Sequence, residues 1–309
     1  MSTSKIYVIY SEQYLYHDTH GDVECKERII VIRDGLLSNK ISNKLIWLEP
    51  YNNLKDITEK MVAWNIHDKK YIKYVKKYCK KGGGKIEKDL WVSSDSYETA
   101  LLSVGGWIKG VQKILETKNN ISFVLARPPG HHAGYDYTLG MCIFANASIA
   151  ANYAIHEKKI DKVAIIDIDV HHGDGTELAV KNNNKILFCS LHQELFTAGT
   201  KKYKMPSKSY GNIINIGIPK KSNYQIYKTH FEQTIVPIFK KFKPKLLIVS
   251  LGLDAAEKDP LANINLKPTD YGKMSKYFRQ ISNKIVLGLE GGYHLESLRD
   301  GIISTLSNI

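Results

Sequence analysis

Residues 167–175, which read DIDVHHGDG, place three aspartates and two histidines within nine positions. They follow the apolar run KVAII, which predicts a buried strand. Alternate side chains of a strand share a face, so Asp167, Asp169 and His171 are expected to point the same way. An isolated buried carboxylate costs several kcal/mol, and a nearby cation offsets that cost. The stretch therefore predicts a cation-binding site.

A third ligand for this cation is predicted at Asp254, which ends the run LLIVSLGLD. Taken alone, Asp254 is equally consistent with a cap on a following helix. Together with Asp169 and His171 it makes a set of three protein ligands, and three ligands with one open position are typical of catalytic zinc sites. Two carboxylates and one imidazole also suit Fe(II) or Co(II).

The motif RPPGHHAG supplies two adjacent histidines, His131 and His132. A histidine that acts as a base needs its other ring nitrogen held by an acceptor, usually a carboxylate. Asp167 and Asp174 remain after the metal ligands are assigned. We therefore expect His131 to pair with Asp167 and His132 with Asp174, which would leave His132 beside a metal-bound water.

The motif LEGGYH adds Tyr293. Its two glycines allow the backbone to approach the site closely. The phenol is able to donate a hydrogen bond to a developing oxyanion, an interaction typically worth about 3 kcal/mol. The alternative is an incidental tyrosine in a turn, which has weight in a chain with 19 tyrosines.

Eight short β-rich runs are expected to position these residues. They read KIYVIYS, KLIWLEP, ISFVLARP, KVAIIDIDV, KILFCSLH, NIINIGIP, KLLIVSLGLD and KIVLGLEGGY, and helical patterns such as ANASIAANYAIHEKK separate several of them. Buried strands that alternate with helices predict an α/β fold with a parallel sheet covered on both faces. No linker or repeat divides the chain, so residues 1–309 are expected to form one domain. The polar motifs follow the strands, where ligands of such sheets bind.

Taken together, RPPGHHAG, DIDVHHGDGT, SLH, SLGLDAAEKDPLANINL and LEGGY resemble the successive motifs of the zinc-dependent histone deacetylase and acetylpolyamine amidohydrolase family, in that family's order. The likeness is to its bacterial class II-like members. It implies the arginase–deacetylase fold, one α/β domain around an eight-stranded parallel sheet. It also implies zinc ligands at Asp169, His171 and Asp254, His132 as general base and acid, and Tyr293 as the residue that polarises the acyl carbonyl.

The same resemblance implies a structural potassium ion. Its ligands would be Asp167, Ser190 and the main-chain oxygens of Asp169, His171 and Leu191. The pair of His131 and Asp167 would lie beside the catalytic centre. Arg28 resembles the arginine of an inner cavity through which the small acid product leaves; a surface salt bridge is an equal alternative for this residue.

Two positions depart from the family pattern and concern the substrate tunnel. In LGMC, Met141 follows Gly140 where the family commonly has an aromatic residue, which predicts a wider and more adaptable tunnel. At the rim, Leu261 stands where one polyamine-selective relative has an acid. Asp89 or Asp95 remains a candidate for a rim carboxylate that orients a substrate amide or amine.

Composition limits the classes of function. The net charge is +13, which raises a nucleic-acid hypothesis. However, the densest lysine stretch, HDKKYIKYVKKYCKKGGGK, has Ile72, Val75 and Cys79 at helical spacing, so an amphipathic helix with a solvated lysine face is favoured over a nucleic-acid surface. The four scattered cysteines, the lack of a membrane-length apolar run and an N-terminus without a leader pattern predict a cytoplasmic protein with reduced thiols.

These observations predict a zinc hydrolase that removes an acetyl group from an acetyl-lysine side chain or a similar acylated amine. An acetylated polyamine is the alternative substrate. An arginase-like enzyme with two metals would need further bridging acids. A non-catalytic binder of acyl-lysine or nucleic acid would not need the complete set of ligands, His132 and Tyr293.

Overall fold

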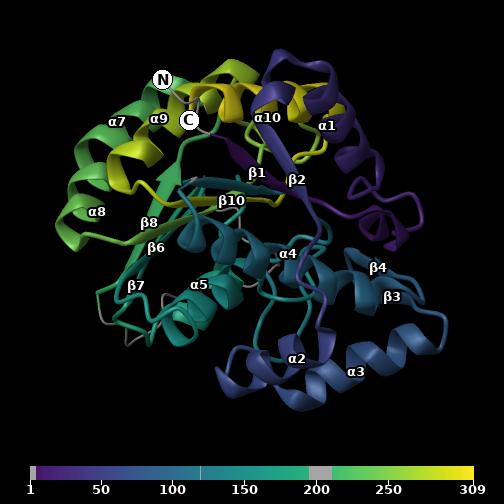
Figure 1. Cartoon of the computed structure of the whole chain (residues 1–309). Helices are drawn as coiled ribbons and strands as arrows, with labels where there is room; N and C mark the ends of the chain where they lie inside the picture. The colour runs from purple at the N-terminus through teal and green to yellow at the C-terminus, as the bar shows by residue number, and fades with distance from the viewer. Residues whose placement is uncertain (1–4, 119, 195–210) are drawn as a thin grey trace.

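The computed structural model describes residues 5–118, 120–194 and 211–309. A parallel sheet of eight strands runs through its centre in the order β2-β1-β5-β10-β9-β6-β7-β8 (Figure 1). The strands are β1 (Ile6–Ile9), β2 (Leu45–Leu48), β5 (Ile121–Val124), β6 (Val163–Asp167), β7 (Ile186–Gln193), β8 (Ile213–Ile218), β9 (Leu246–Leu251) and β10 (Ile285–Leu289). Seven of them lie within the predicted runs and β7 extends one residue beyond its run, so the sequence-based prediction of the sheet is confirmed.

Helices cover both faces of the sheet. In Figure 1, α4 and α5 lie on one face and α1 and α7–α10 lie on the other. The helices are α1 (Glu27–Ser38), α2 (Leu54–Ala63), α3 (Lys69–Lys80), α4 (Ser96–Glu116), α5 (Asn146–His156), α6 (Asp174–Val180), α7 (Tyr224–His230), α8 (Val236–Phe242), α9 (Pro268–Ile281) and α10 (Leu295–Asn308), with shorter turns η1 (Glu12–Tyr16), η2 (Lys40–Lys44) and η3 (Phe231–Ile235). The central strands are apolar and buried on both sides, as expected for this layering.

A second, two-stranded antiparallel sheet was not predicted from the sequence. It is a hairpin of β3 (Gly84–Glu87) and β4 (Leu90–Val92), and it lies between α3 and α4. Its strands are only four and three residues long, and the first contains a glycine, a lysine and a glutamate. Such a short polar segment lacks the apolar alternation that predicts a strand.

The strand that carries DIDVHH ends earlier than predicted. β6 stops at Asp167, which pairs with Ser190 of β7 and Ser250 of β9. Asp169 and His171 therefore lie in the turn that leads to α6 and not in the strand itself. The expectation of strand alternation through His171 is wrong, because the chain bends as soon as it leaves the sheet.

The core and the cysteines agree with a compactly folded chain. Buried apolar side chains from seven of the eight strands form one continuous cluster, and the partly buried side chains of β2 pack against it. All four cysteines are unbonded thiols, and three of them are buried. Among the described residues, no helix is long and apolar enough to cross a membrane.

Candidate active site

Three side chains that the sequence predicts as metal ligands converge just beyond the carboxyl ends of β6 and β9. One ligand atom from each of Asp169, His171 and Asp254 lies within 4.8 Å of the others. The Nδ1 atom of His171 is 3.1 Å from Asp169 Oδ1 and 3.0 Å from Asp254 Oδ2. We call these three residues the ligand cluster.

Backbone N–H groups orient both carboxylates. Val170 N–H donates to Asp254 Oδ1 at 2.8 Å, and Gly291 N–H donates to Asp169 Oδ2 at 2.8 Å. A Cβ atom at position 291 would come within 2.5 Å of both carboxylates, so the turn approaches this closely only because residue 291 is glycine. The LEGGY turn thus closes one side of the ligand cluster.

The ligand cluster contains two acidic side chains and only one basic side chain. Burial, followed by repulsion from Asp169, raises the pKa of Asp254 to about 7. Burial lowers the pKa of His171, but hydrogen bonds and attraction from Asp169 and Asp254 outweigh burial and raise it to about 10. Both shifts mean that the cluster retains protons, because two buried carboxylates need positive charge between them. A divalent cation meets the same need, so the donor set fits a metal ion of the kind that carboxylate and imidazole bind.

Both predicted histidine–aspartate pairs are present. His131 Nδ1 is 3.0 Å from Asp167 Oδ2, and His132 Nδ1 is 2.7 Å from Asp174 Oδ1. The imidazole rings of His131 and His132 lie 3.9 Å apart, and the His132 ring is 6.0 Å from that of His171. The two pairs therefore lie side by side next to the ligand cluster.

The two histidines differ in charge. Burial and the neighbouring charge of His131 lower the pKa of His132 to about 4, although Asp174 opposes the shift. Burial also acts to lower the pKa of His131, but Asp169 and Asp167 outweigh it and hold that pKa well above its usual value. At neutral pH His132 is therefore an uncharged imidazole able to accept a proton, while His131 is a cation between two carboxylates.

Tyr293 is half-buried and its backbone is fixed by an aspartate that sequence analysis missed. Asp259 accepts hydrogen bonds from Tyr293 N–H at 2.7 Å, His294 N–H at 3.3 Å and Leu261 N–H at 3.0 Å. Asp259 lies in the motif SLGLDAAEKDP, but an acid before a proline gives no sequence signal for this role. Burial, against the opposing effect of Arg28, raises the pKa of Tyr293 well above its usual value, so the phenol stays protonated and able to donate.

Arg28 is fully buried, so the surface salt bridge considered for it is wrong. It donates to Gly292 O at 2.7 Å, to Glu290 O at 2.5 Å and to Glu24 Oε1 at 2.9 Å, and its guanidinium lies 4.9 Å from the centre of the Tyr293 ring. The residues before Tyr293 are therefore tied to α1 near the other end of the chain.

Glu24 joins Arg28 to a second buried arginine, Arg127. Arg127 Nε and NH2 donate to the two carboxylate oxygens of Glu24 at 2.9 and 2.7 Å. The two arginines, through attraction and hydrogen bonds, outweigh burial and lower the pKa of Glu24 to about 2. We call Glu24, Arg28 and Arg127 the arginine cluster. Sequence analysis missed Glu24 and Arg127, because residues 103 positions apart give no local sign of pairing.

Another group with potential ligand atoms lies beside the ligand cluster. It consists of His131, Cys142 and Glu290, all buried. Their polar atoms already have protein partners: His131 Nδ1 pairs with Asp167, and Glu290 accepts from Gly130 N–H at 2.7 Å and from Ser250 Oγ–H at 3.1 Å. This group therefore supports the packing of the site and does not resemble the open ligand cluster.

The residues expected around a potassium ion also lie close together. Asp167 ends β6, and Ser190, its neighbour in β7, is followed by the buried Leu191. Ser190 Oγ is 2.9 Å from His192 Nδ1 and 3.4 Å from Gly173 N. The pairing of β6 with β7 thus brings Asp167 next to Ser190, and the potassium site stays a prediction.

The predicted tunnel residues occupy exposed or half-buried turns. Gly140 and Met141 both have positive φ angles and form a tight turn, and Leu261 is half-buried. Asp89 and Asp95 are exposed, and the rim role considered for one of them stays a prediction. The structure links Leu261 to Tyr293 through Asp259.

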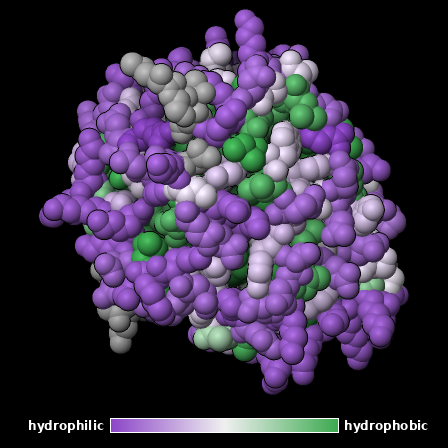
Figure 2. Space-filling view, in the orientation of Figure 1, coloured by the Kyte–Doolittle hydropathy of each residue, from purple (hydrophilic) through white to green (hydrophobic). Residues whose placement is uncertain are grey.

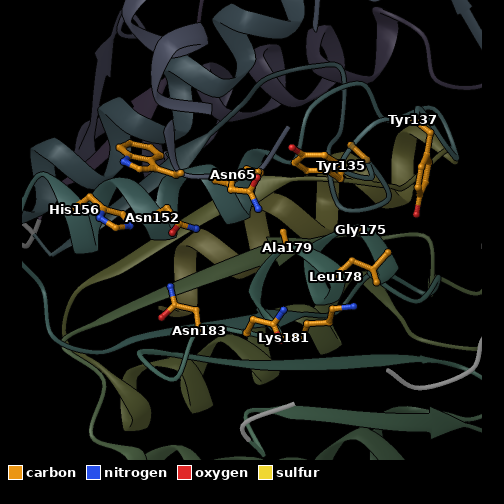
Figure 3. A pocket seen from close by; sticks show the side chains of 14 residues that line it. Asn65, Tyr135, Tyr137, Asn152, His156, Gly175, Leu178, Ala179, Lys181 and Asn183 are labelled. Carbon is orange, nitrogen blue, oxygen red and sulfur yellow. The ribbon is translucent and has the colours of Figure 1, made fainter. Parts of the chain in front are cut away.

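A pocket of about 450 Å³ lies behind the His132 segment (Figure 3). Ala133 and Gly175 line it next to His132 and Asp174, and side chains from α5 and α6 complete the wall. It contains none of the predicted metal ligands. It is a neighbouring cavity and not the site where these ligands converge.

Comparison with known proteins agrees with this geometry. The model of the histone deacetylase domain matches residues 22–309. The chain is 39% identical to the uncharacterized protein slr0245 of Synechocystis sp., over 97% of each chain, and 32% identical to Histone deacetylase 18 of Arabidopsis thaliana, over 96% of this chain and 46% of that protein. The chain thus spans about half the length of the plant relative.

The structure superimposes on the crystal structure of the HDA15 HD domain with a TM-score of 0.88 and 26% identity, covering 97% of this chain and 90% of that one. The fold is therefore the arginase–deacetylase fold. The chain belongs to the histone deacetylase family, a family of deacetylases.

Proposed function

We propose that this protein is a zinc-dependent amidohydrolase that removes the acetyl group from an acetyl-lysine side chain. The observation that carries the proposal is the ligand cluster, in which two buried carboxylates share one imidazole beside an uncharged His132. A zinc ion held by Asp169, His171 and Asp254 would supply a Lewis acid for the acyl carbonyl and lower the pKa of a bound water.

The chain's own residues have separate tasks in this proposal. His132 accepts a proton from the attacking water, and Asp174 holds its Nδ1 so that Nε2 faces the reaction. The proton then passes to the leaving amine from His132. Tyr293 donates a hydrogen bond from its phenol to the oxygen that develops negative charge. His131 and Asp167 remain a fixed charged pair behind His132.

Two further parts of the proposal concern the bound ions and the cellular compartment. A potassium ion bound by Asp167, Ser190 and main-chain oxygens, including that of Leu191, would stabilise the turn after β6. Fe(II) or Co(II) is an alternative occupant of the ligand cluster, because its carboxylate and imidazole donors suit both. We place the enzyme in the cytoplasm, where the four free thiols remain reduced.

Substrate choice rests on charge. Acetyl-lysine buries an apolar stem and a neutral amide, whereas a polyamine brings several positive charges towards a protein of net charge +13. At the rim, the carboxylate next to Leu261 is that of Asp259, and its Oδ1 already accepts a hydrogen bond from the Leu261 backbone. Acetyl-lysine is therefore the favoured substrate and an acetylpolyamine the alternative.

The direct test is a side-by-side comparison of kcat/KM for a fluorogenic acetyl-lysine amide, acetylputrescine and acetylspermidine with the zinc-loaded protein. We expect the acetyl-lysine substrate to equal or exceed both polyamines. Much faster turnover of a polyamine would reverse the substrate assignment. No turnover of any of the three, with zinc bound, would overturn the proposal of an amidohydrolase.

A further inference from the structure

Residues 69–88, which comprise α3, the glycine turn and most of the β3–β4 hairpin, carry an unusual share of the charge. They contain nine lysines and a single acid, Glu87. The segment therefore holds eight of the thirteen net positive charges in less than a tenth of the chain. We call it the basic arm. Its lysines are Lys69, Lys70, Lys73, Lys76, Lys77, Lys80, Lys81, Lys85 and Lys88.

The positive charge of the basic arm is not neutralised within the described residues. All nine lysine side chains are exposed, and none forms an ion pair with any described acid. Lysines elsewhere, such as Lys60 and Lys158, do have acidic partners at 2.5 and 2.6 Å. The surface over α3 is mostly hydrophilic in Figure 2.

This arrangement costs the helix stability. Lys69, Lys73 and Lys77 follow one another at i, i+4 spacing, as do Lys76 and Lys80, and like charges at this spacing destabilise a helix by a few tenths of a kcal/mol per pair. The buried side chains Tyr71, Ile72, Val75 and Cys79 account for the fold of α3, but they do not require lysine at the exposed positions. An external anion would relieve the repulsion.

Both ends of the basic arm are anchored to segments that lead into the candidate active site. At its start, Asp68 N–H donates to Tyr135 O at 2.9 Å and Tyr71 O–H donates to Ile143 O at 2.6 Å. Those two acceptors flank the turn of Gly140 and Met141, which follows His132. The arm therefore lies directly against the loop proposed as the tunnel wall.

Just beyond its other end, residues 91 and 93 contact the segment of residues 16–24, which includes Glu24 of the arginine cluster. The His20 ring contacts the Trp91 ring of β4 with centroids 4.9 Å apart, and Ser93 Oγ–H donates to Tyr16 O at 3.2 Å. In Figure 1, α3, β3 and β4 lie together at the edge of the molecule, beyond α4. A polypeptide bound along this edge would therefore lie near two segments that lead to the site, the turn of Gly140 and Met141 and the loop that carries Glu24.

We propose that the basic arm binds acidic side chains that flank the acyl-lysine of a polypeptide substrate, so that the preferred substrates are acyl-lysines in acidic sequences. This inference rests on the proposed function. A polypeptide carries the reacting lysine and the acidic recognition residues on one molecule, whereas a nucleic acid has no acyl-lysine to offer the site. The same positive field disfavours polyamines and lysine-rich tails.

The test uses three acetyl-lysine peptides of equal length, flanked on both sides by Glu, by Gln or by Lys. An unflanked acetyl-lysine amide reports turnover that does not depend on the arm. The arm variant is Lys73→Gln, Lys77→Gln and Lys80→Gln, which keeps helix-favouring residues at exposed positions. The matched control is Lys240→Gln, Lys241→Gln and Lys245→Gln, which removes the same charge on and after α8, on the opposite side of the sheet.

At low ionic strength we expect the wild type to favour the Glu peptide over the Gln peptide by roughly five- to tenfold in kcat/KM, and to disfavour the Lys peptide. The preference should shrink in 0.5 M salt, because charges more than a few ångströms apart are screened from each other at that ionic strength. The arm variant should lose most of it, the control variant should keep it, and all three proteins should turn over the unflanked amide equally.

Equal kcat/KM for the Glu and Gln peptides, or a preference that survives in the arm variant, would overturn the inference. The inference would also be overturned if the wild type bound a labelled single-stranded DNA, the arm variant did not, and neither protein distinguished the three peptides. That result would favour a nucleic-acid surface. If the unflanked amide is not hydrolysed by the zinc-loaded wild type, the proposed function fails. The fluorescence anisotropy of a labelled Glu-rich peptide then still decides whether the arm binds acidic peptides, because the arm variant should lose this binding and the control variant should keep it.

Discussion

The ligand cluster and the arginine cluster are both buried and charged and lie on either side of the LEGGY turn, yet they balance charge differently. In the arginine cluster, two guanidinium groups enclose one carboxylate, and their remaining N–H groups reach main-chain carbonyls. In the ligand cluster, two carboxylates share one imidazole. The first cluster is satisfied by the protein itself, and the second needs a positive ion.

This difference distinguishes a cluster with a structural role from a cluster that is able to bind a ligand. A cluster whose buried hydrogen-bonding groups are all paired within the protein gains little from a ligand and serves to hold the backbone in place. A cluster that lacks a partner is where a ligand contributes most binding energy. The following experiments test whether the two clusters divide these tasks.

The largest effect is expected from Asp254→Ala, which removes one of the three proposed metal ligands. We predict that bound zinc falls from about one per chain to almost none, and that kcat/KM drops by about 10³ or more, because the remaining two ligands hold zinc weakly. Elemental analysis and a fluorogenic acetyl-lysine assay measure both. The exposed Asp161→Ala is the control. Two tightly bound transition metals per wild-type chain would instead support an arginase-like centre.

The matching change in the arginine cluster is Glu24→Gln, which leaves two buried guanidinium groups without their carboxylate. We expect the free energy of unfolding to fall by about 3–5 kcal/mol, as is usual when one partner of a buried ion pair is removed. Urea titration measures this, with the exposed Glu27→Gln as the control. Zinc bound per folded chain should remain near one; loss of zinc from folded protein would show that the clusters do not divide their tasks.

The same carboxylate predicts a pH dependence. The folded-state pKa of Glu24, about 2, lies below its ordinary value of 4.5, so its stabilisation is complete above pH 4.5 and is lost as pH falls towards 2. Acid titration of the wild type should therefore show a loss of stability across this window, measured by circular dichroism. Glu24→Gln should show a shallower loss, and parallel curves for the two proteins would contradict the assignment.

Tyr293→Phe is expected to act on catalysis alone. The phenyl ring still packs on Arg28, so zinc content and stability should stay unchanged, while kcat falls by about 10² because a transition-state hydrogen bond is lost. Steady-state kinetics measure this, and the exposed Tyr74→Phe is the control. A nearly normal kcat would mean that the tyrosine belongs with the supporting arginine cluster.

The smallest effect concerns the rim. Leu261→Glu adds an acid near the proposed entrance, and we predict a several-fold shift of kcat/KM towards acetylspermidine relative to acetyl-lysine. Competition between the two substrates measures the shift, and Leu261→Gln controls for size and polarity. An unchanged ratio would place Leu261 away from the path of the substrate.

The sequence predicts the ligand cluster far better than the arginine cluster, for a physical reason. The strands are long apolar runs that are visible locally, and Asp169, His171 and Asp254 each follow such a run directly. Parallel strands bring those ends together without further information. The pairs of Glu24 with Arg127 and of Arg28 with Gly292 join residues 103 and 264 positions apart, and no local pattern encodes them.

The same reason explains the remaining differences. The β3–β4 hairpin has no apolar periodicity, so its presence depends on contacts such as that of His20 with Trp91. The early end of β6 depends on hydrogen bonds from the 169–171 backbone. Two of them go to the nearby carboxylates of Asp167 and Asp169, but Val170 N–H donates to Asp254, 84 residues further along the chain, and no local pattern encodes that contact.

The link from Arg28 to Gly292 has a consequence for how the protein is made. Arg28 leaves the ribosome well before its carbonyl acceptor Gly292, which lies 264 residues further along the chain. While those residues are being translated, the arginine has no backbone partner at the future LEGGY turn. The link between α1 and the LEGGY turn can therefore form only after residues 290–292 have been synthesised, and a chain terminated before residue 290 contains all three residues of the ligand cluster but lacks this link.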